Sequence, residues 1–437
     1  MRRPFRLLAR HLFYGWVVVG AAFVCLFVAF GVAYSFGTYF EPLRDEFSTN
    51  REAISLVFAL TGLLYFALGG LTGPAADRYG PRVVAFGGAG VLALGLLLAS
   101  RAQAVWQVYF SYGFCVGSGV AACYVPSVAA IQRWFIRRRA FASGVAVSGI
   151  GLGTVVAPPL SSALIDAYGW RTAMALTGCV AGVLGAAAAW ALERAPAALG
   201  LRPDGIAPTT AGQEREAPAV AGLSVGEAVR TKAFAWLYAA AVLATAPVFL
   251  ALGHLVPYGQ DEGLSLSEAS LGLTGIGIGS TVGRLLLSPF GDRIGRRTSY
   301  AASIGGMALL TFLWFAVPLT SVPLLVVWGA LFGSAYGAFV ALSPTLMADY
   351  FGTRAVSGII GIFYTAAGVG ALVGPWAGGA IYDAAGSYRP AILAAALAAT
   401  AGLLAVWRSP PPVTVQGWRN PHAGVPASAD PPQAESG

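Results

Sequence analysis

Arg284 has the clearest chemical potential of any side chain in this sequence, because it lies inside a long apolar run at residues 266–288. It precedes Asp292 by eight residues, or about 12 Å at a helical rise of about 1.5 Å per residue. An arginine at such depth in a membrane is costly unless it is paired or hydrated. An anionic ligand could supply the missing charge, since a guanidinium can bind a carboxylate through two parallel hydrogen bonds. The alternative is an arginine satisfied by carbonyls, hydroxyls and water.

Four tyrosines and a histidine in other apolar runs are further candidates for substrate binding: Tyr34, Tyr124, Tyr336, Tyr364 and His254. A phenol offers an apolar wall and a hydroxyl for a carboxylate oxygen, although packing alone also explains a tyrosine in a membrane helix. His254 could relay protons, since its unperturbed pKa is about 6.5. It could equally form hydrogen bonds at the membrane interface beside Tyr258, which is the interpretation we favour.

The runs that hold these residues indicate an all-α membrane protein. The chain is 57% hydrophobic and 11% charged, whereas a soluble domain has about a quarter charged residues. A helix that spans the bilayer needs about 20 mostly apolar residues. Twelve such runs occur, at 14–40, 53–72, 82–100, 105–131, 140–165, 171–192, 233–258, 266–288, 298–317, 322–347, 356–381 and 389–407. We therefore expect twelve transmembrane helices in a lipid bilayer.

The distribution of basic residues predicts how the chain crosses the membrane. With the N-terminus inside, 21 of the 27 Lys and Arg residues fall on the inner side, 5 fall on the outer side and Arg284 lies within a span. Because cytoplasmic loops are rich in Lys and Arg, both termini are expected in the cytoplasm. The basic residues lie in short clusters between apolar runs, which argues against a nucleic-acid partner despite a net charge of +8. A single lysine among many arginines is typical of GC-rich bacteria, so we expect a bacterial inner (plasma) membrane.

The second half of the chain repeats the first at an offset of 215 to 217 residues. Pro158, Asp166 and Gly169 each have a counterpart 217 residues later, at Pro375, Asp383 and Gly386. The repeat predicts six-helix bundles at 1–193 and 233–408, a cytoplasmic linker at 194–232 and a disordered cytoplasmic tail at 409–437. Parallel six-span repeats are a transporter architecture, with the substrate site between them near the bilayer midplane.

The loop after the second run, Gly73 to Arg82, has the pattern G-x-x-x-D-R-x-G-x-R, which resembles the signature loop of the major facilitator superfamily. The copy at 288–297 differs only in having serine at the first glycine. The resemblance implies the major facilitator fold, with twelve helices in two pseudo-symmetric six-helix bundles. Two roles explain these loops equally well: gating, and a purely structural role in topology and folding. The candidate gating residues are Asp77, Arg78, Arg82, Asp292, Arg293 and Arg297.

Several shorter strings are similar to the monocarboxylate and oxalate–formate exchanger branch of that superfamily. They are Tyr14-Gly15-Trp16, Tyr34-Ser35-Phe36-Gly37, Arg133-Trp134-Phe135, His254-Leu255-Val256-Pro257-Tyr258 and Gly279-Ser280-Thr281-Val282-Gly283-Arg284. The resemblance implies that Arg284 binds the substrate carboxylate and that spans 1, 4, 7 and 10 line the cavity. Two family features are missing here, a lysine in span 11 and an acidic residue before Arg284. A monocarboxylate is therefore favoured over a dianion, and both proton symport and exchange for a counter-anion stay open.

Searches for catalytic motifs favour a carrier over an enzyme. The sequence has no G-x-x-x-x-G-K-[ST] phosphate-binding loop, and its three histidines are too scattered for a metal cluster. We expect no cofactor, no metal and a monomer that moves small organic anions, most simply monocarboxylates, by alternating access. The alternatives are an exporter of neutral or drug-like solutes on the same fold and a non-transporting membrane sensor.

Overall fold

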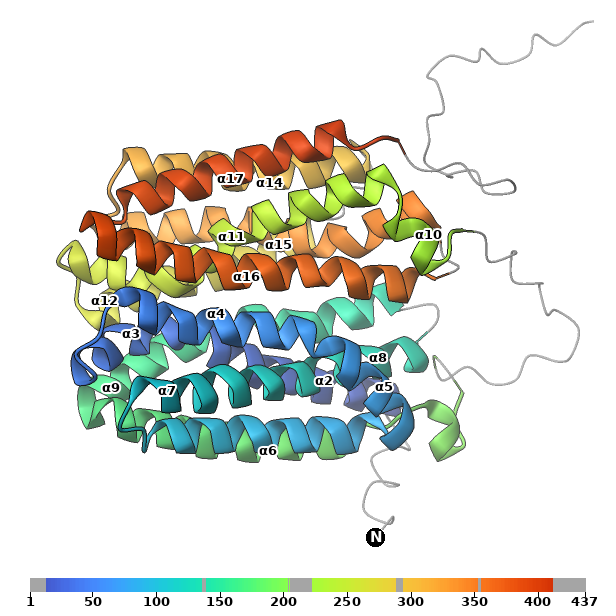
Figure 1. Ribbon diagram of the computed structural model, residues 1–437. Coiled ribbons are helices and arrows are strands. Elements are labelled where there is room, and N and C mark those ends of the chain that lie inside the picture. The colour runs from blue at the N-terminus through green and yellow to red at the C-terminus, as the bar shows by residue number, and fades with distance from the viewer. Residues whose placement is uncertain are drawn as a thin grey trace, which may run out of the picture.

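The structure is a computed structural model that describes residues 13–135, 139–202, 204, 222–287, 294–352 and 355–411. In these ranges the regular elements are helices, and most of them run side by side in two bundles (Figure 1). One bundle contains α2–α9, coloured blue to green, and the other contains α11–α17, coloured yellow-green to red. We call these bundles the first and second halves.

The first half contains six membrane spans. They are α2 (Tyr14–Tyr34) with α3 (Phe36–Glu46), α4 (Arg51–Ala67) with α5 (Gly69–Tyr79), α6 (Pro81–Ala99), α7 (Val105–Val108) with a π-helical stretch (Tyr109–Val116) and α8 (Gly117–Trp134), and α9 (Arg139–Ala191). The second span bends by 42° after Ala67. Helix α9 holds two spans, because its backbone turns at Gly169, where φ is 74°. Glycine adopts this φ readily because it has no Cβ.

The second half repeats this plan. Its spans are α11 (Lys232–Asp261), α12 (Leu266–Val282) with a π-helical turn (Gly283–Leu287), α14 (Arg296–Ala316), α15 (Val322–Phe351), α16 (Val356–Ala385) and α17 (Arg389–Arg408). Together the described residues contain the twelve spans that the apolar runs predict. The predicted all-helical fold of two six-helix bundles is confirmed.

The connection between the halves is described only in part. Residues 203 and 205–221 of the predicted linker lie outside the described residues, as does most of the predicted tail, 412–437. A short 3-10 helix (Pro196–Leu199) follows the first half, and α10 (Val225–Val229) precedes the second. The amide of Leu223 donates to the carbonyl of Phe351 at 2.9 Å, so the end of the linker is bound to the second half.

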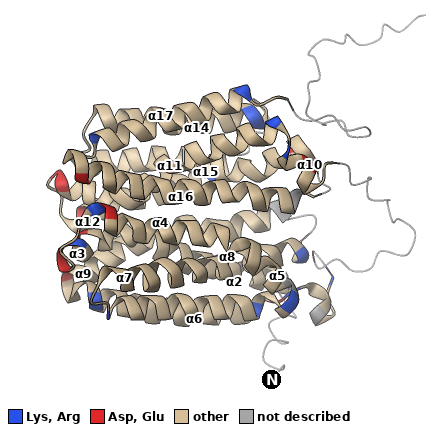
Figure 2. Cartoon of the chain, viewed as in Figure 1, with Lys and Arg blue, Asp and Glu red and all other residues tan. Residues whose placement is uncertain are grey.

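The sides of the bundle are apolar. Large side chains such as Leu94, Leu309 and Trp407 are 52%, 69% and 72% exposed. Figure 2 shows the charged residues gathered at the two ends of the molecule, with few between them. Apolar exposure on this scale is expected of a surface in contact with lipid.

The two ends differ in how the halves meet. We call the end with Glu41, Arg51, Asp261 and Tyr388 the closed face, and the end with Phe13, Ala191 and Ser409 the terminal face. The side-chain bonds that join the halves include Arg51–Asp261 (2.6 Å), Arg51–Tyr388 (2.6 Å), Trp376–Glu52 (2.8 Å), Ser267–Asp166 (2.8 Å) and Ser162–Ser270 (3.3 Å). At the terminal face, the described ion pairs Arg82–Glu193 (2.9 Å) and Arg296–Asp349 (2.7 Å) each stay within one half. The halves are thus bonded to each other at the closed face.

Near the middle of the bundle the halves touch through glycine. A Cβ added to Gly277 of α12 would lie 2.8 Å from the carbonyl oxygen of Gly151 of α9. At the closed face, a Cβ on Gly379 of α16 would lie 2.5 Å from the hydroxyl of Ser55 of α4, next to Arg51. Small residues permit this close approach of membrane helices.

Candidate functional site

A cavity between the two halves encloses about 630 Å³ of space, including the part open to solvent. It is lined by Phe30, Tyr34, Phe66, Tyr124, Ile150, Ala241, Thr245, Phe249, Arg284, Tyr336, Phe339, Val340, Ser343, Phe363, Tyr364 and Ala367. The first five come from the first half and the others from the second. A substrate bound here would touch both halves.

Arg284 reaches this cavity from the π-helical turn that ends the eighth span. Its side chain is half-buried, and its guanidinium carbon lies 5.8 Å from the centre of the Tyr336 ring. Gly279 and Gly283 allow α12 to lie against α15, because a Cβ on either would collide with the carbonyl oxygen of Ala330 or Ser334. π-Helical turns occur frequently at functional sites. The local backbone therefore places the one cationic side chain among the described lining residues beside an aromatic face.

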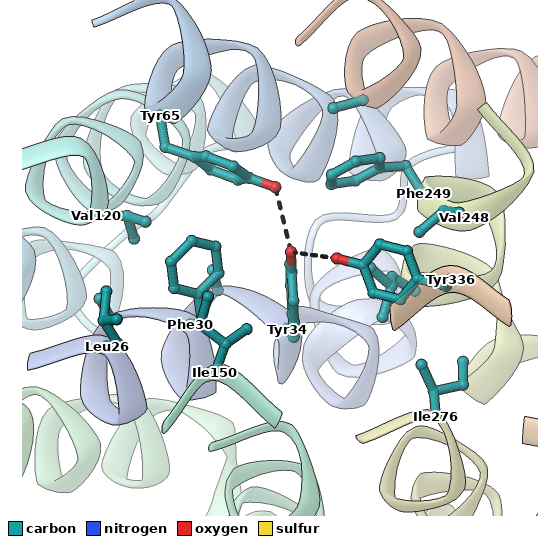
Figure 3. Packing of buried hydrophobic residues seen from close by; sticks show 14 of the residues in the cluster. Leu26, Phe30, Tyr34, Tyr65, Val120, Ile150, Val248, Phe249, Ile276 and Tyr336 are labelled. Atoms are coloured by element: carbon teal, nitrogen blue, oxygen red, sulfur yellow. Dashed lines mark hydrogen bonds between the residues drawn. The ribbon is translucent and has the colours of Figure 1, made fainter. Parts of the chain in front are cut away.

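A chain of phenol groups crosses from one half to the other beside this arginine (Figure 3). The hydroxyl of Tyr34 is 3.4 Å from that of Tyr65 in the first half and 3.3 Å from that of Tyr336 in the second. Tyr34 and Tyr336 line the cavity. Each hydroxyl has one hydrogen, which it can donate either to a neighbouring phenol or to an acceptor in the cavity.

The remaining wall is mostly aromatic. The ring of Phe30 lies 5.5 Å from those of Tyr34 and Tyr124, and both pairs meet edge to face. Phe66 of the first half lies 6.3 Å from Phe249 and 6.4 Å from Tyr364 of the second. Edge-to-face and offset arrangements at such distances are the favourable ones for aromatic rings.

The structure brings together five of the six residues proposed from the sequence to bind substrate. Arg284, Tyr34, Tyr124, Tyr336 and Tyr364 all line the cavity.

The sixth, His254, is fully buried and belongs to a different cluster. Its Nε2 is 2.8 Å from the carbonyl oxygen of Pro375 and 3.1 Å from the hydroxyl of Ser55, and its Nδ1 is 2.9 Å from the hydroxyl of Tyr388. Because a carbonyl only accepts, Nε2 carries a hydrogen, and in the neutral ring Nδ1 accepts from Tyr388.

Arg51 is the centre of this second cluster, and sequence reasoning did not identify it. Its side chain is 4% exposed and pairs with Glu41 at 3.0 Å and with Asp261 at 2.6 Å. It also donates to the hydroxyl of Tyr388 at 2.6 Å, and its guanidinium lies 4.0 Å from the centre of the Tyr382 ring. Arg51 and Glu41 belong to the first half and the other three to the second, so the cluster bonds the halves together at the closed face.

The candidate gating residues that the structure describes lie at the terminal face. Asp292 and Arg293 lie outside the described residues, as does the side chain of Asp77. Arg78 is exposed and lies over the ring of its neighbour Tyr79.

Arg82 and Arg297 have matching roles in the two halves. Arg82 donates to the carbonyl of Leu192 and to Glu193, where the sixth span ends. Arg297 donates to the carbonyls of Val406, Trp407 and Ser409, where the twelfth span ends. In each half, the arginine joins the start of the third span to the end of the sixth span of that half.

Comparison with known proteins agrees with this architecture. The sequence model of the Major Facilitator Superfamily matches residues 22–286 and 255–431. The chain is 27% identical over 415 residues to monocarboxylate transporter 12 of Rattus norvegicus, covering 87% of this chain and 82% of that protein. It is 28% identical over 401 residues to monocarboxylate transporter 13 of Bos taurus, covering 89% and 88%. It is also 28% identical over 381 residues to the MFS transporter asaE of Aspergillus flavus, covering 85% and 81%.

Among solved structures, the fold is similar to that of a bacterial homologue of the human lysosomal transporter Spinster, crystallised in an inward-facing and unoccupied conformation. The TM-score is 0.67 at 16% identity, with 91% of this chain and 98% of that chain covered. The similarity supports a twelve-helix transporter fold.

Proposed function

Because this chain belongs to the major facilitator superfamily and is a membrane transporter, we propose that it is a secondary carrier of small organic anions, with monocarboxylates as substrates. The observation that carries this proposal is Arg284 in a cavity between the two halves. The similarity to monocarboxylate transporters 12 and 13 supports the same proposal.

In this proposal the guanidinium of Arg284 binds the carboxylate, and the hydroxyls of Tyr336 and Tyr34 complete its hydrogen bonds. Charge-assisted bonds of this kind are about twice as strong as neutral ones. Arg284 is the one cationic side chain among the described lining residues, so it balances one negative charge and not two. Tyr124 and Tyr364 act as walls of the same site.

The carrier works by alternating access. The bonds around Arg51 join the halves at the closed face, whereas the described ion pairs of the terminal face stay within one half. Since 21 basic residues fall on the side of the termini against 5 on the other, we place the terminal face in the cytoplasm of a bacterial inner membrane. In this proposal the structure corresponds to an inward-facing state, and the carrier is a monomer with bundles at 1–193 and 233–408.

The two loops with the D-R pattern, at 73–82 and 288–297, are the proposed gates of this cytoplasmic side. Arg82 and Arg297 hold each loop to the last span of its own half, so the loop and the half would move as one unit. The residues assigned to the gates are Asp77, Arg78 and Arg82 in the first half and Asp292, Arg293 and Arg297 in the second.

The test is uptake of labelled lactate, formate and oxalate into proteoliposomes, with a pH gradient or with unlabelled anion inside. Saturable uptake of a monocarboxylate, lost in Arg284→Ala and kept in Arg101→Ala, is the expected result. Arg101 is an exposed arginine of the closed-face loop after α6 and serves as the matched control. Uptake driven by the pH gradient would indicate proton symport, and uptake driven by unlabelled anion inside would indicate anion exchange. Uptake that is indifferent to Arg284 in a folded protein would overturn the site and favour a neutral solute.

A further inference from the structure

We propose that the substrate of this carrier is a monocarboxylate with a ring-sized apolar body and no amino group. This inference rests on the proposed function and specifies its substrate class. It follows from three features of the cavity. Its lining is mostly aromatic and aliphatic, both halves contribute aromatic rings to it, and its described lining holds one positive charge and no negative charge.

The walls suit a substrate with a large apolar surface. Nine of the sixteen described lining residues are aromatic, and four more are aliphatic. Apart from the tyrosine hydroxyls, the polar atoms come from Thr245, Ser343 and Arg284. The hydroxyls of Thr245 and Ser343 already donate to the carbonyls of Ala241 at 2.6 Å and Phe339 at 2.8 Å. Formate or lactate would use Arg284 and leave most of this surface facing water. An acid with an apolar body would cover the surface, and removal of apolar area from water is favourable.

The rings favour an aromatic body over an aliphatic chain. Phe30 of the first half is 4% exposed, and Phe249 and Phe363 of the second are each 2% exposed. Rings held this firmly offer both edges and faces to a flat guest at fixed positions. Because Phe66 packs edge to face on Phe249 across the boundary of the halves, a ring bound against this pair would contact both halves at once. The carboxylate at Arg284 and the ring would then hold the substrate at two points.

The charges of the lining exclude an amino acid. The described residues that line the cavity include neither Asp nor Glu. The ammonium group of an amino acid would lie close to the guanidinium of Arg284, and the described lining offers that ammonium group no carboxylate. Burial of a charge without a partner is strongly unfavourable, and two like charges at short range repel. The site therefore fits an unsubstituted or 2-oxo acid.

The experiment measures counterflow of labelled lactate in proteoliposomes and compares phenylacetate, unlabelled lactate and phenylalanine as competitors. Protein-free liposomes and liposomes with Arg284→Ala correct for acid that crosses the bilayer unaided. Phenylacetate is expected to reach half-inhibition at a concentration at least about tenfold lower than lactate, and phenylalanine is expected not to compete. Titration calorimetry of the purified protein with phenylacetate measures binding independently of transport.

Phe249→Leu tests the contribution of a ring, since leucine keeps the side chain apolar. The preference for phenylacetate over 3-methylbutyrate should fall by about three- to tenfold, as expected for loss of an aromatic pair. Phe332→Leu is the matched control. Phe332 is 1% exposed, and its ring stacks on the ring of Trp328 with the two centres 4.9 Å apart. It is not among the described residues that line the cavity. The preference should stay unchanged in this control.

The outcomes separate the two proposals. Transport of lactate that depends on Arg284, with phenylacetate no better, would overturn the present inference and leave the proposed function in place. Transport of phenylalanine equal to phenylacetate would overturn the exclusion of amines. If no acid binds or moves in a manner that depends on Arg284, both proposals fail.

Discussion

Replacement of Arg51 by methionine is expected to open the closed face. Arg51 donates to Asp261 and to Tyr388 of the second half, both at 2.6 Å, and lies over the ring of Tyr382 at 4.0 Å. Methionine keeps much of the apolar volume of the side chain and removes all three interactions. The pair with Glu41 is also lost, but it lies within the first half. Its loss therefore lowers the stability of the fold and leaves the equilibrium between the states closed and open at this face largely unchanged.

The magnitude follows from the contacts that cross between the halves. A hydrogen bond to a charged group contributes about 1.5–3 kcal/mol. We take about 1.5 kcal/mol for Asp261, because its side chain is 32% exposed and is screened by solvent. Tyr388, buried at 4% exposure, adds about 1 kcal/mol, and the contact with Tyr382 adds about 0.5 kcal/mol. The sum of about 3 kcal/mol corresponds to roughly a hundredfold shift toward the state open at this face.

The assay is the rate at which a membrane-impermeant maleimide modifies a cysteine placed at Val256. Val256 is fully buried in α11, and its Cγ2 would lie 3.4 Å from a Cβ on Gly37 of the first half. Its reaction requires separation of the halves, so the rate reports the open population. The exposed Cys179 is replaced by serine, whereas the other three cysteines are buried.

Arg171→Met is the matched control. Arg171 pairs with Glu46 at 2.7 Å and donates to the carbonyls of Ser100 and Ala102, all within the first half near the closed face. The labelling rate should rise about a hundredfold in Arg51→Met and stay unchanged in Arg171→Met. An increase of less than about threefold in a folded Arg51→Met protein would refute the assigned role of Arg51.

Three further substitutions test neighbouring parts of the structure. Tyr388→Phe removes the hydroxyl between Arg51 and His254, and the same labelling rate should rise by about fivefold, as for loss of one hydrogen bond. His254→Ala should lower the free energy of unfolding by about 2–3 kcal/mol in denaturant titrations, because buried partners lose their hydrogen bonds. The KM for substrate should be unchanged, and a large rise in KM with normal stability would contradict the placement of His254 outside the cavity. Gly379→Val should hold the closed face open, since a Cβ there meets Ser55 and the backbone of Arg51. Rapid labelling should result, and labelling as slow as in the natural protein would contradict the close packing of α4 on α16.

The sequence predicted the fold and named five of the sixteen described residues that line the cavity, because these depend on local patterns. Apolar length alone identifies membrane spans, and a charge within a span such as Arg284 is conspicuous. Arg51 was missed because it lies between apolar runs, where an arginine is expected to face water. Its partners Asp261 and Tyr388 are 210 and 337 residues away in the chain, so only the assembled halves bring them together. The position of His254 in its span suggested the membrane interface, whereas packing of α4, α11 and α16 encloses it completely.

The glycine contact between α9 and α12 bears on how one half can turn against the other. Most packed helices interlock through side chains that form ridges and grooves, and rotation must lift one set of ridges over the other. At Gly151 and Gly277 the two backbones meet directly, with the carbonyl oxygen of Gly151 2.8 Å from where a Cβ of Gly277 would be. Contact of this kind has no ridge to lift, so it can serve as a pivot with a low barrier. A place where the two halves approach closely is then also a place where they can rotate easily.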